Sequence, residues 1–337
     1  MTEPDIPLDP FRERGARARR LQFRMLGARF EFESTSATLL GVAESAYAGL
    51  PTHGWGRGQV RCRIALVLTP GKPTHSRSEP RPTRLFSAGR TLCAVADEST
   101  FVTVSPEDRS AIVAVSPRML EFEYHLRYEL IDLAVYLLAA RCRGLIPLHS
   151  ACLSVRDRAA LLTGPSGSGK STLALQWLAQ GLEFVSEDSV LVDPRSLHAT
   201  GLPNFVHLRS DSLRFLDHPS LEAAIRASPV IRRRSGVRKF EVDLRGRDCR
   251  LAARPPRLKS IVFASPQSAN GGELLTPLSH REVLRRLRES QPYALQQQGW
   301  SAFAKSLSRI EAYELRRGRH PAEATSALRD LLMAGRR

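Results

Sequence analysis

The feature that most constrains this fold is a glycine-rich loop at residues 164–171, Gly-Pro-Ser-Gly-Ser-Gly-Lys-Ser. The loop matches the phosphate-binding pattern G-x-x-x-x-G-K-[ST] at every position. A strand-like run at 159–163 precedes it, and a helical run at 171–180 follows it. In that context glycines let consecutive backbone N–H groups point at a phosphate, and the helix N-terminus favours negative charge. The loop therefore predicts an α/β fold with a nucleotide-phosphate site.

Residue types within the loop indicate the ligand. Lys170 is expected to reach the β- and γ-phosphates of ATP, and the Ser171 hydroxyl is expected to ligate Mg²⁺. The expected ATP-binding residues are Gly164, Pro165, Ser166, Gly167, Ser168, Gly169, Lys170, Ser171 and Thr172.

A pair of adjacent acids follows the loop after a single helical run. Glu187 and Asp188 lie 17 and 18 residues after Lys170, at the end of a strand-like segment. One carboxylate can hold Mg²⁺, and the other can take a proton from an attacking hydroxyl. A solvated acidic turn is the alternative interpretation. His149, 15 residues before Gly164, opens the hairpin that leads into the loop, and a structural role is its alternative.

Together, these three features resemble the catalytic domain of the HPr kinase/phosphorylase family, which has a histidine, a P-loop and an acid pair at the same spacings. The family shares its fold with ATP-dependent phosphoenolpyruvate carboxykinase. The resemblance covers residues 146–192 and implies that Lys170 and the loop backbone hold ATP. It also implies that Ser171 and Asp188 serve Mg²⁺. Glu187 then occupies the position of the catalytic base, and His149 lies near the transferred phosphate.

The chain departs from the family's pattern in two places. The first acid is Glu187, where the family usually has aspartate. The family's acid-x-Arg-Gly-x-Gly segment has only a partial counterpart, Asp243-Leu244-Arg245-Gly246. The reverse, phosphorylase reaction is therefore not expected from the resemblance. The residues before 121 do not match the regulatory domain of true HPr kinases.

The expected architecture is an α/β P-loop kinase core of the HPr-kinase/PEP-carboxykinase type, preceded by a smaller α+β N-terminal domain. Residues 1–20, rich in proline and arginine, are expected to form a flexible arm, and residues 21–120 the N-terminal domain. Apolar residues recur at helical spacing from Phe122 to Leu137, which predicts a connecting helix over 121–144. Residues 145–335 form the expected HPr-kinase-like ATP-binding catalytic domain.

Composition narrows the compartment and the partners. The 337-residue chain has a net charge of +16, but no aromatic-studded basic stripe or zinc finger accompanies it, so nucleic acid is disfavoured. No apolar run reaches the length of a membrane span, which is about 18 residues. Five scattered cysteines without a C-x-x-C pair favour a reducing, cytoplasmic environment.

The expected function is an ATP- and Mg²⁺-dependent kinase that phosphorylates a hydroxyl, with the serine of a peptide or protein as the acceptor. The basic segment 231–239 is a candidate for binding an acidic substrate or the ATP phosphates, with a solvated loop as the alternative. Other functions stay open: a small-molecule hydroxyl kinase, a carboxykinase-like enzyme, a non-catalytic ATP-binding switch (a pseudokinase), or a nucleic-acid-associated ATPase. Relatives often form rings, so the resemblance also admits a homo-oligomer.

Overall fold

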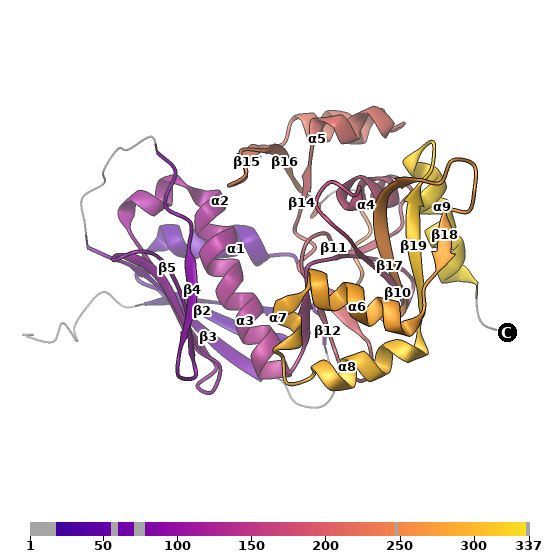
Figure 1. Ribbon diagram of the computed structural model, residues 1–337. Coiled ribbons are helices and arrows are strands. Elements are labelled where there is room, and N and C mark those ends of the chain that lie inside the picture. The colour runs from indigo at the N-terminus through magenta and orange to yellow at the C-terminus, as the bar shows by residue number, and fades with distance from the viewer. Residues whose placement is uncertain (1–17, 55–59, 71–77, 247–248, 335–337) are drawn as a thin grey trace, which may run out of the picture.

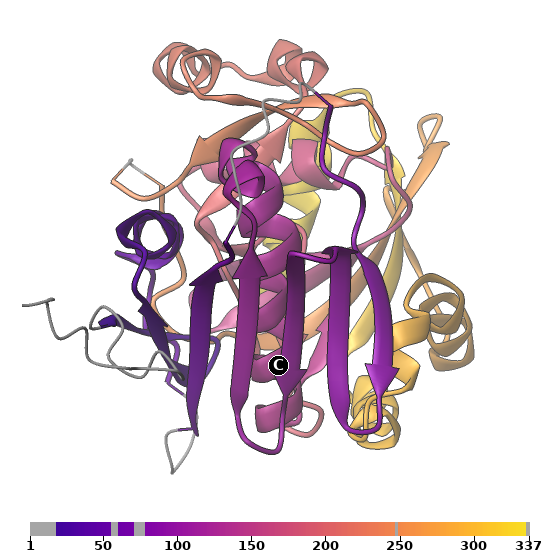
Figure 2. The ribbon, with the colours of Figure 1, turned by 90° about the vertical axis from the view of Figure 1, so that its left-hand side faces the viewer.

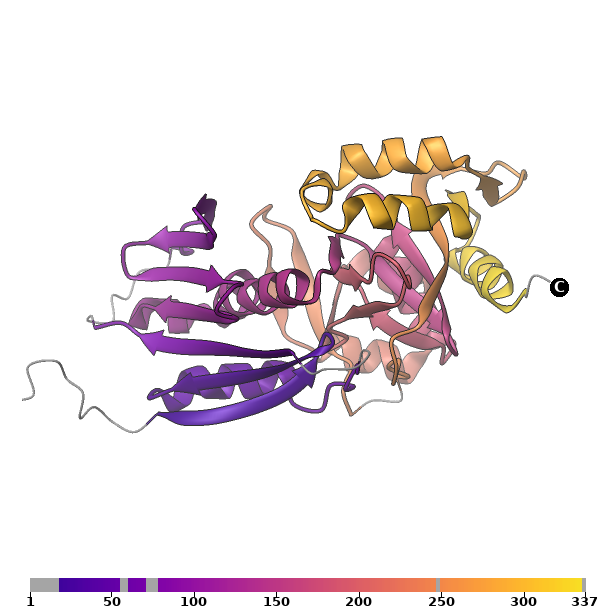
Figure 3. The same ribbon diagram turned by 90° about the horizontal axis from the view of Figure 1, so that it is seen from below.

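The computed structural model describes residues 18–54, 60–70, 78–246 and 249–334. The chain forms two α/β parts that lie side by side, an N-terminal part up to Leu145 and a C-terminal part from Ile146 (Figure 1, Figure 3). They share apolar packing, because Leu191 and Leu202 of the C-terminal part belong to the N-terminal hydrophobic core. The mixed sheets and helices confirm the predicted α/β class, and the four-segment division of the chain remains a prediction.

The N-terminal part is built on a seven-stranded mixed sheet. Its strands, in sheet order, are β1 (Arg19–Met25), β2 (Ala28–Ser34), β3 (Val60–Leu68), β7 (Ser110–Val115), β6 (Thr100–Ser105), β5 (Thr91–Asp97) and β4 (Arg84–Ala88). β3 is parallel to both β2 and β7, and the other neighbours are antiparallel. Because side chains alternate between the faces of a strand, β2 buries every second residue on the face of the sheet that helices cover. Figure 2 shows the sheet with these helices behind it.

Two helical segments cover the buried face of this sheet. The first is α1 (Ala37–Tyr47), whose N-cap Ser36 accepts a hydrogen bond from the Leu39 amide. The second follows the 3₁₀ turn η1 (Pro117–Glu121) and contains α2 (Glu123–His125), a π-helical turn (Leu126–Ile131) and α3 (Asp132–Arg143). It ends at Gly144, where a φ of 64° suits glycine.

Two sequence predictions for this part need correction. The segment 121–144 is not one uniform α-helix, because it contains the π-helical turn. It packs on the N-terminal sheet through apolar residues such as Leu130 and Leu138. The flexible arm predicted for 1–20 is wrong at its end, since Arg19 and Arg20 belong to β1 and pair with β2. Residues 1–17 of that arm lie outside the described residues.

The C-terminal part is built on a six-stranded sheet that carries the glycine-rich loop. In order, its strands are β11 (Glu183–Ser186), β9 (Ala151–Val155), β10 (Arg158–Thr163), β17 (Arg257–Ser268), β19 (Glu311–Arg317) and β18 (Leu275–Pro277). β10, β17 and β19 run parallel, and the loop joins the end of β10 to α4 (Lys170–Ala179). α4 and α9 (Pro321–Met333) pack in one hydrophobic core, while α6 (His280–Ser290), α7 (Pro292–Leu295) and α8 (Trp300–Ser306) pack in another.

Two three-stranded sheets complete this part. One contains β13 (Ala199–Gly201), β12 (Val190–Val192) and β8 (Ile146–Leu148), and the other contains β14 (Phe205–Leu208), β16 (Arg238–Asp243) and β15 (Val230–Arg232). The 3₁₀ turn η3 (Ser210–Phe215) and α5 (Pro219–Arg226) follow β14.

The single strand predicted for 184–192 is wrong. The chain leaves the six-stranded sheet at Ser186 and enters a different sheet at Val190. The Ser186 hydroxyl donates to the Ser189 carbonyl at 2.7 Å, which closes a tight turn. Glu187 and Asp188 therefore lie in a junction between two sheets and belong to neither of the two strands.

Candidate active site

A cleft of about 460 Å³ lies where β10, β11, β17 and β19 end. Ligands of open α/β sheets commonly bind outside the carboxyl ends of the strands. The cleft is lined by His149, by residues 166–172 of the loop and helix, and by Glu187 and Asp188. The structure thus brings together sequence-predicted residues from three separate segments. Gly164 and Pro165 do not line the cleft, but both direct their carbonyls at Lys170.

The loop backbone has the geometry of a phosphate cradle. Gly164, Gly167 and Gly169 have φ values of 151°, 80° and 101°, which residues other than glycine rarely adopt. A Cβ on Gly164 would lie 2.6 Å from the Ala264 carbonyl oxygen of β17, whereas one on Gly167 would meet nothing within 4 Å. The loop is therefore packed against the sheet at its base and open at its tip.

Lys170 and Ser168 carry polar groups that suit an anionic ligand. Lys170 is only 9% exposed, and its Nζ donates to the carbonyls of Gly164 at 2.7 Å and Pro165 at 3.2 Å. Burial lowers the pKa of Lys170, although the nearby Asp188 and Glu187 oppose that shift. The buried Ser168 hydroxyl has no hydrogen-bond partner among the described residues. A bound phosphate would compensate both groups, so the loop fits the triphosphate that the sequence predicts.

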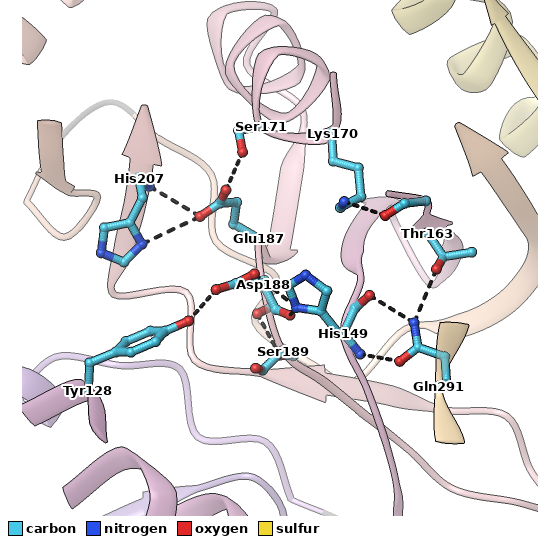
Figure 4. A network of polar contacts seen from close by, with 12 residues as sticks. Tyr128, His149, Thr163, Lys170, Ser171, Glu187, Asp188, Ser189, His207 and Gln291 are labelled. Atoms are coloured by element: carbon cyan, nitrogen blue, oxygen red, sulfur yellow. Dashed lines mark hydrogen bonds and ion pairs between the residues drawn. The ribbon is translucent and has the colours of Figure 1, made fainter. Parts of the chain in front are cut away.

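Glu187 faces the start of α4. Its carboxylate accepts hydrogen bonds from the Ser171 hydroxyl and, at 3.2 Å, from the His207 backbone amide (Figure 4). The His207 Nδ1 lies 3.6 Å from the same carboxylate. Burial alone would raise the pKa of Glu187, but the hydrogen bond from His207 and the charges of His207 and Lys239 bring it below its usual value. Glu187 is therefore a buried, ionised group held against the Ser171 hydroxyl.

Asp188 points in another direction. One carboxylate oxygen accepts hydrogen bonds from the Tyr128 hydroxyl and, at 3.4 Å, from the Arg233 guanidinium. The other lies 3.1 Å from the His149 Nδ1. Burial would raise the pKa of Asp188, but the hydrogen bonds and positive charges around it lower that pKa well below its usual range. Its side chain is 20% exposed, against 5% for Glu187, so Asp188 is the acid more open to a second substrate.

His149 borders the cleft beside Asp188 and is held by its backbone. Its amide lies 2.9 Å from the Gln291 Oε1 and 2.7 Å from the Tyr293 hydroxyl, and the Gln291 amide donates back to its carbonyl at 3.2 Å. The side chain is 54% exposed, and its hydrogen bond with Asp188 raises the pKa of the imidazole. His149 is therefore positioned between the acid pair and the open cleft.

The structure also brings in residues that the sequence did not single out for the site. These are Tyr128, Gln291 and Tyr293. Their contacts join segments far apart in the chain, and no local motif marks them. Arg233 and Lys239 belong to the basic segment 231–239, and both line the cleft. The basic segment 231–239 is the sequence feature that points to Arg233 and Lys239.

The partial signature at 243–246 lies elsewhere. Arg245 donates to the Asp243 carboxylate at 2.7 Å and to the carbonyls of Ser45 and Ala48 at 2.6 Å and 2.9 Å. Neither Arg245 nor Asp243 lines the cleft. This segment therefore connects the C-terminal part to the end of α1.

Thr172 is the last of the predicted ATP-binding residues. Its hydroxyl lies 3.0 Å from the Ser212 hydroxyl.

The oxygen atoms beside the loop suit a hard cation such as Mg²⁺, to which bound phosphates would also be ligands. The described residues contain no group of three or more His, Cys, Asp or Glu side chains that could hold a metal ion by themselves. The Ser171 hydroxyl and the Glu187 carboxylate are adjacent oxygen donors beside the loop. Mg²⁺ typically takes one or two protein oxygens and completes its shell with water and substrate phosphates. Ser171 and Glu187 therefore fit Mg²⁺. The resemblance implies Ser171 with Asp188 instead, but the Asp188 carboxylate contacts Tyr128, Arg233 and His149 and not Ser171.

Comparison with known proteins gives one similarity in sequence. The chain is 33% identical over 84 residues to HPr kinase/phosphorylase from Xanthomonas oryzae pv. oryzae and from Xanthomonas axonopodis pv. citri. The match covers 25% of this chain and 27% of the relatives, so it spans about a quarter of their length. This stretch of the chain is similar to HPr kinase/phosphorylase. No family model matches it.

A solved structure aligns with this chain only loosely. It is the HPr(Ser) kinase/phosphatase from Coxiella burnetii, with 12% identity, a TM-score of 0.26, and coverage of 55% of this chain and 94% of that one. The similarity to HPr kinase/phosphorylase therefore rests on the sequence match over 84 residues. None of the helices in the described ranges has the length and apolar content needed to cross a bilayer.

Proposed function

We propose that this chain is an ATP- and Mg²⁺-dependent kinase that transfers the γ-phosphate to a hydroxyl, with the serine of a peptide or protein as the acceptor. The observation that carries the proposal is the convergence of Lys170, Glu187 and Asp188 on one cleft. The relatives are named for the protein HPr, which supports a protein acceptor. A cytoplasmic location and a homo-oligomer remain predictions.

The contacts support a division of labour between the acids that reverses the one implied by the resemblance. Glu187 shares a hydrogen bond with Ser171 and is nearly inaccessible, which suits it to Mg²⁺ together with that hydroxyl. Asp188 is ionised and more exposed, which suits it to take the proton of the acceptor hydroxyl. When bound, Mg²⁺ would neutralise charge on the phosphates.

The transfer then balances as a simple displacement. The acceptor oxygen forms a bond to the γ-phosphorus, the bond between that phosphorus and the β,γ-bridging oxygen breaks, and the hydroxyl proton passes to Asp188. Lys170 and Arg233, which both line the cleft, would offset the negative charge of the transferred group. His149 would contact the same group from its exposed position. Most of the rate acceleration would come from positioning and electrostatics.

The apolar residues that line the cleft support a base-binding role. Leu173, Phe215, Pro321 and Ala324 form an apolar part of the cleft wall. The Arg214 guanidinium lies 4.6 Å from the centre of the Phe215 ring, beside that wall. An adenine ring stacked in this wall would leave the triphosphate directed at the loop and the acids.

Transfer of label from ATP to a serine-peptide library tests the function. The expected result is labelled phosphoserine with γ-labelled ATP and no label on the peptide with α-labelled ATP. The Asp188→Asn protein is the matched control, because its side chain has the same size but cannot accept the proton. Label that never leaves ATP, in the presence of peptides and of water, would contradict the kinase and favour a non-catalytic ATP-binding switch.

A further inference from the structure

Three consecutive residues of the N-terminal part reach into the C-terminal part beside the acid pair. They lie on the π-helical turn 126–131, and turns of this kind are frequent at functional sites. Arg127 forms an ion pair with Glu241, Tyr128 donates a hydrogen bond to Asp188, and Glu129 forms an ion pair with Arg234 at 2.6 Å.

The turn contacts Asp188 directly and is linked to Glu187 through two intermediate residues. Tyr128 bonds to Asp188 itself. Arg127 contacts Glu241, which lies 3.1 Å from the His207 Nε2, and the His207 amide in turn donates to Glu187. Tyr128 thus meets Asp188 on the side of the acid pair that faces away from Lys170 and Ser171 (Figure 4).

Tyr128 is the member of this turn with the most constrained side chain. Its ring stacks on Tyr124 at a centroid distance of 5.4 Å and meets the His207 ring edge-on at 5.8 Å. The Arg233 guanidinium lies 5.0 Å from the ring centre on the cleft side. Its neighbours Leu126 and Leu130 are fully buried in the N-terminal core, so the backbone that carries the ring is fixed.

We propose that Tyr128 is a positioning residue of the active site, which the N-terminal part supplies to hold the Asp188 carboxylate toward the acceptor. The inference rests on the proposed function. Asp188 follows a tight turn between two sheets, and its carboxylate would otherwise be directed only by Arg233 and His149, which face the cleft. The phenol binds the carboxylate from behind and leaves the cleft side open. The N-terminal part is then required for phosphotransfer and not for nucleotide binding.

Tyr128→Phe removes the hydroxyl alone and keeps the packed ring. With water as the acceptor, followed as ADP release from ATP·Mg²⁺, we expect kcat to fall about 10- to 100-fold, because the acid loses its orientation. The KM for ATP and the ATP-induced rise in melting temperature should match the wild type. A kcat per folded molecule equal to that of the wild type would overturn the proposal.

Tyr124→Phe is the matched control. Tyr124 lies on the preceding turn, and its hydroxyl has no hydrogen-bond partner among the residues that the structure describes. This variant should retain the wild-type kcat. An equal fall in both variants would show that the effect does not depend on the hydrogen bond to Asp188, and would contradict a positioning role.

A stability cycle tests the contact without any turnover. Unfolding of Tyr128→Phe, Asp188→Asn and the double variant by urea should show non-additive losses, as for residues in direct contact. Additive losses would overturn the contact and the proposal, while leaving the kinase assignment intact. Wild-type protein that binds ATP but releases no ADP would instead count against the proposed function, and the positioning role would fall with it.

Discussion

The Ser171 hydroxyl and the Glu187 carboxylate form a hydrogen bond across a gap of 16 residues in the chain. It joins the first turn of α4, which follows the loop, to the junction that follows β11. The helix N-terminus and the acid pair thus form one site.

Lys170→Ala tests the nucleotide site. A ligand at about 100 times its Kd stabilises a protein by about 2.7 kcal/mol, and we expect this gain with ATP·Mg²⁺ to vanish in the variant. The measurement is the melting temperature with and without nucleotide. Lys305→Ala, on the exposed surface of α8, is the control and should keep the full shift. An undiminished shift in Lys170→Ala would place the nucleotide elsewhere.

Substitution of each acid separates their roles. Glu187→Gln keeps the shape but removes the charge beside Ser171, so the Mg²⁺ concentration for half-maximal turnover should rise about 10- to 100-fold. Asp188→Asn should leave that concentration and ATP binding nearly unchanged and lower kcat by about 10²- to 10⁴-fold. Titration of ADP release with Mg²⁺ measures both effects. The opposite pattern would return the base role to Glu187.

Phe215→Ala tests the base-binding part of the cleft. Loss of the ring should weaken ATP binding about tenfold, which is the effect of about 1.4 kcal/mol of contact. Inorganic triphosphate, which has no base, should bind the variant as it binds the wild type. Calorimetric titration of both ligands gives the comparison. Equal weakening of both would show that the substitution disturbs the loop instead.

Much of the site could be predicted from the sequence because its signals are local. The loop pattern, the acid pair and His149 lie within 40 consecutive residues, and the strands β9, β10 and β11 with the helix α4 bring them together. The break between β11 and β12 was missed because the run at 184–192 is apolar on both sides of the acids, as in a single strand. The spacing from Phe122 to Leu137 indicates a helix but does not distinguish a π-helical turn from α-helix.

The rest of the site depends on contacts that no local pattern records. Tyr128 and Gln291 contact Asp188 and His149 from segments that are 60 and 142 residues away in the chain. They are placed there by packing of the π-helical turn against the N-terminal sheet and of α7 against β8. Such placement follows from tertiary structure, which a single sequence does not specify by motif.

The ion pairs of Glu129 predict a pH-dependent link between the two parts. Burial alone would raise its pKa, but hydrogen bonds from His125 and Arg234 lower the pKa of Glu129 to about 2. Because this pKa is depressed, the stabilisation is present above the unfolded value near 4.5 and is lost as pH falls toward about 2. Glu129→Gln should therefore cost about 1–3 kcal/mol at pH 7 and progressively less below pH 4.5.

Urea unfolding across this pH range checks the prediction for Glu129. Glu44→Gln, at an exposed position of α1, should show little change at any pH. A cost for Glu129→Gln that stays constant from pH 7 to pH 3 would indicate that packing, and not charge, links the turn to Arg234.

The most direct test of the central claim is a crystal structure with a non-hydrolysable ATP analogue and Mg²⁺. We predict the triphosphate within the loop 164–171, Mg²⁺ bound by Ser171 and Glu187, and the Asp188 carboxylate within reach of an acceptor oxygen in line with the γ-phosphorus. A γ-phosphate directed away from both acids, or an analogue bound outside the loop, would contradict the account.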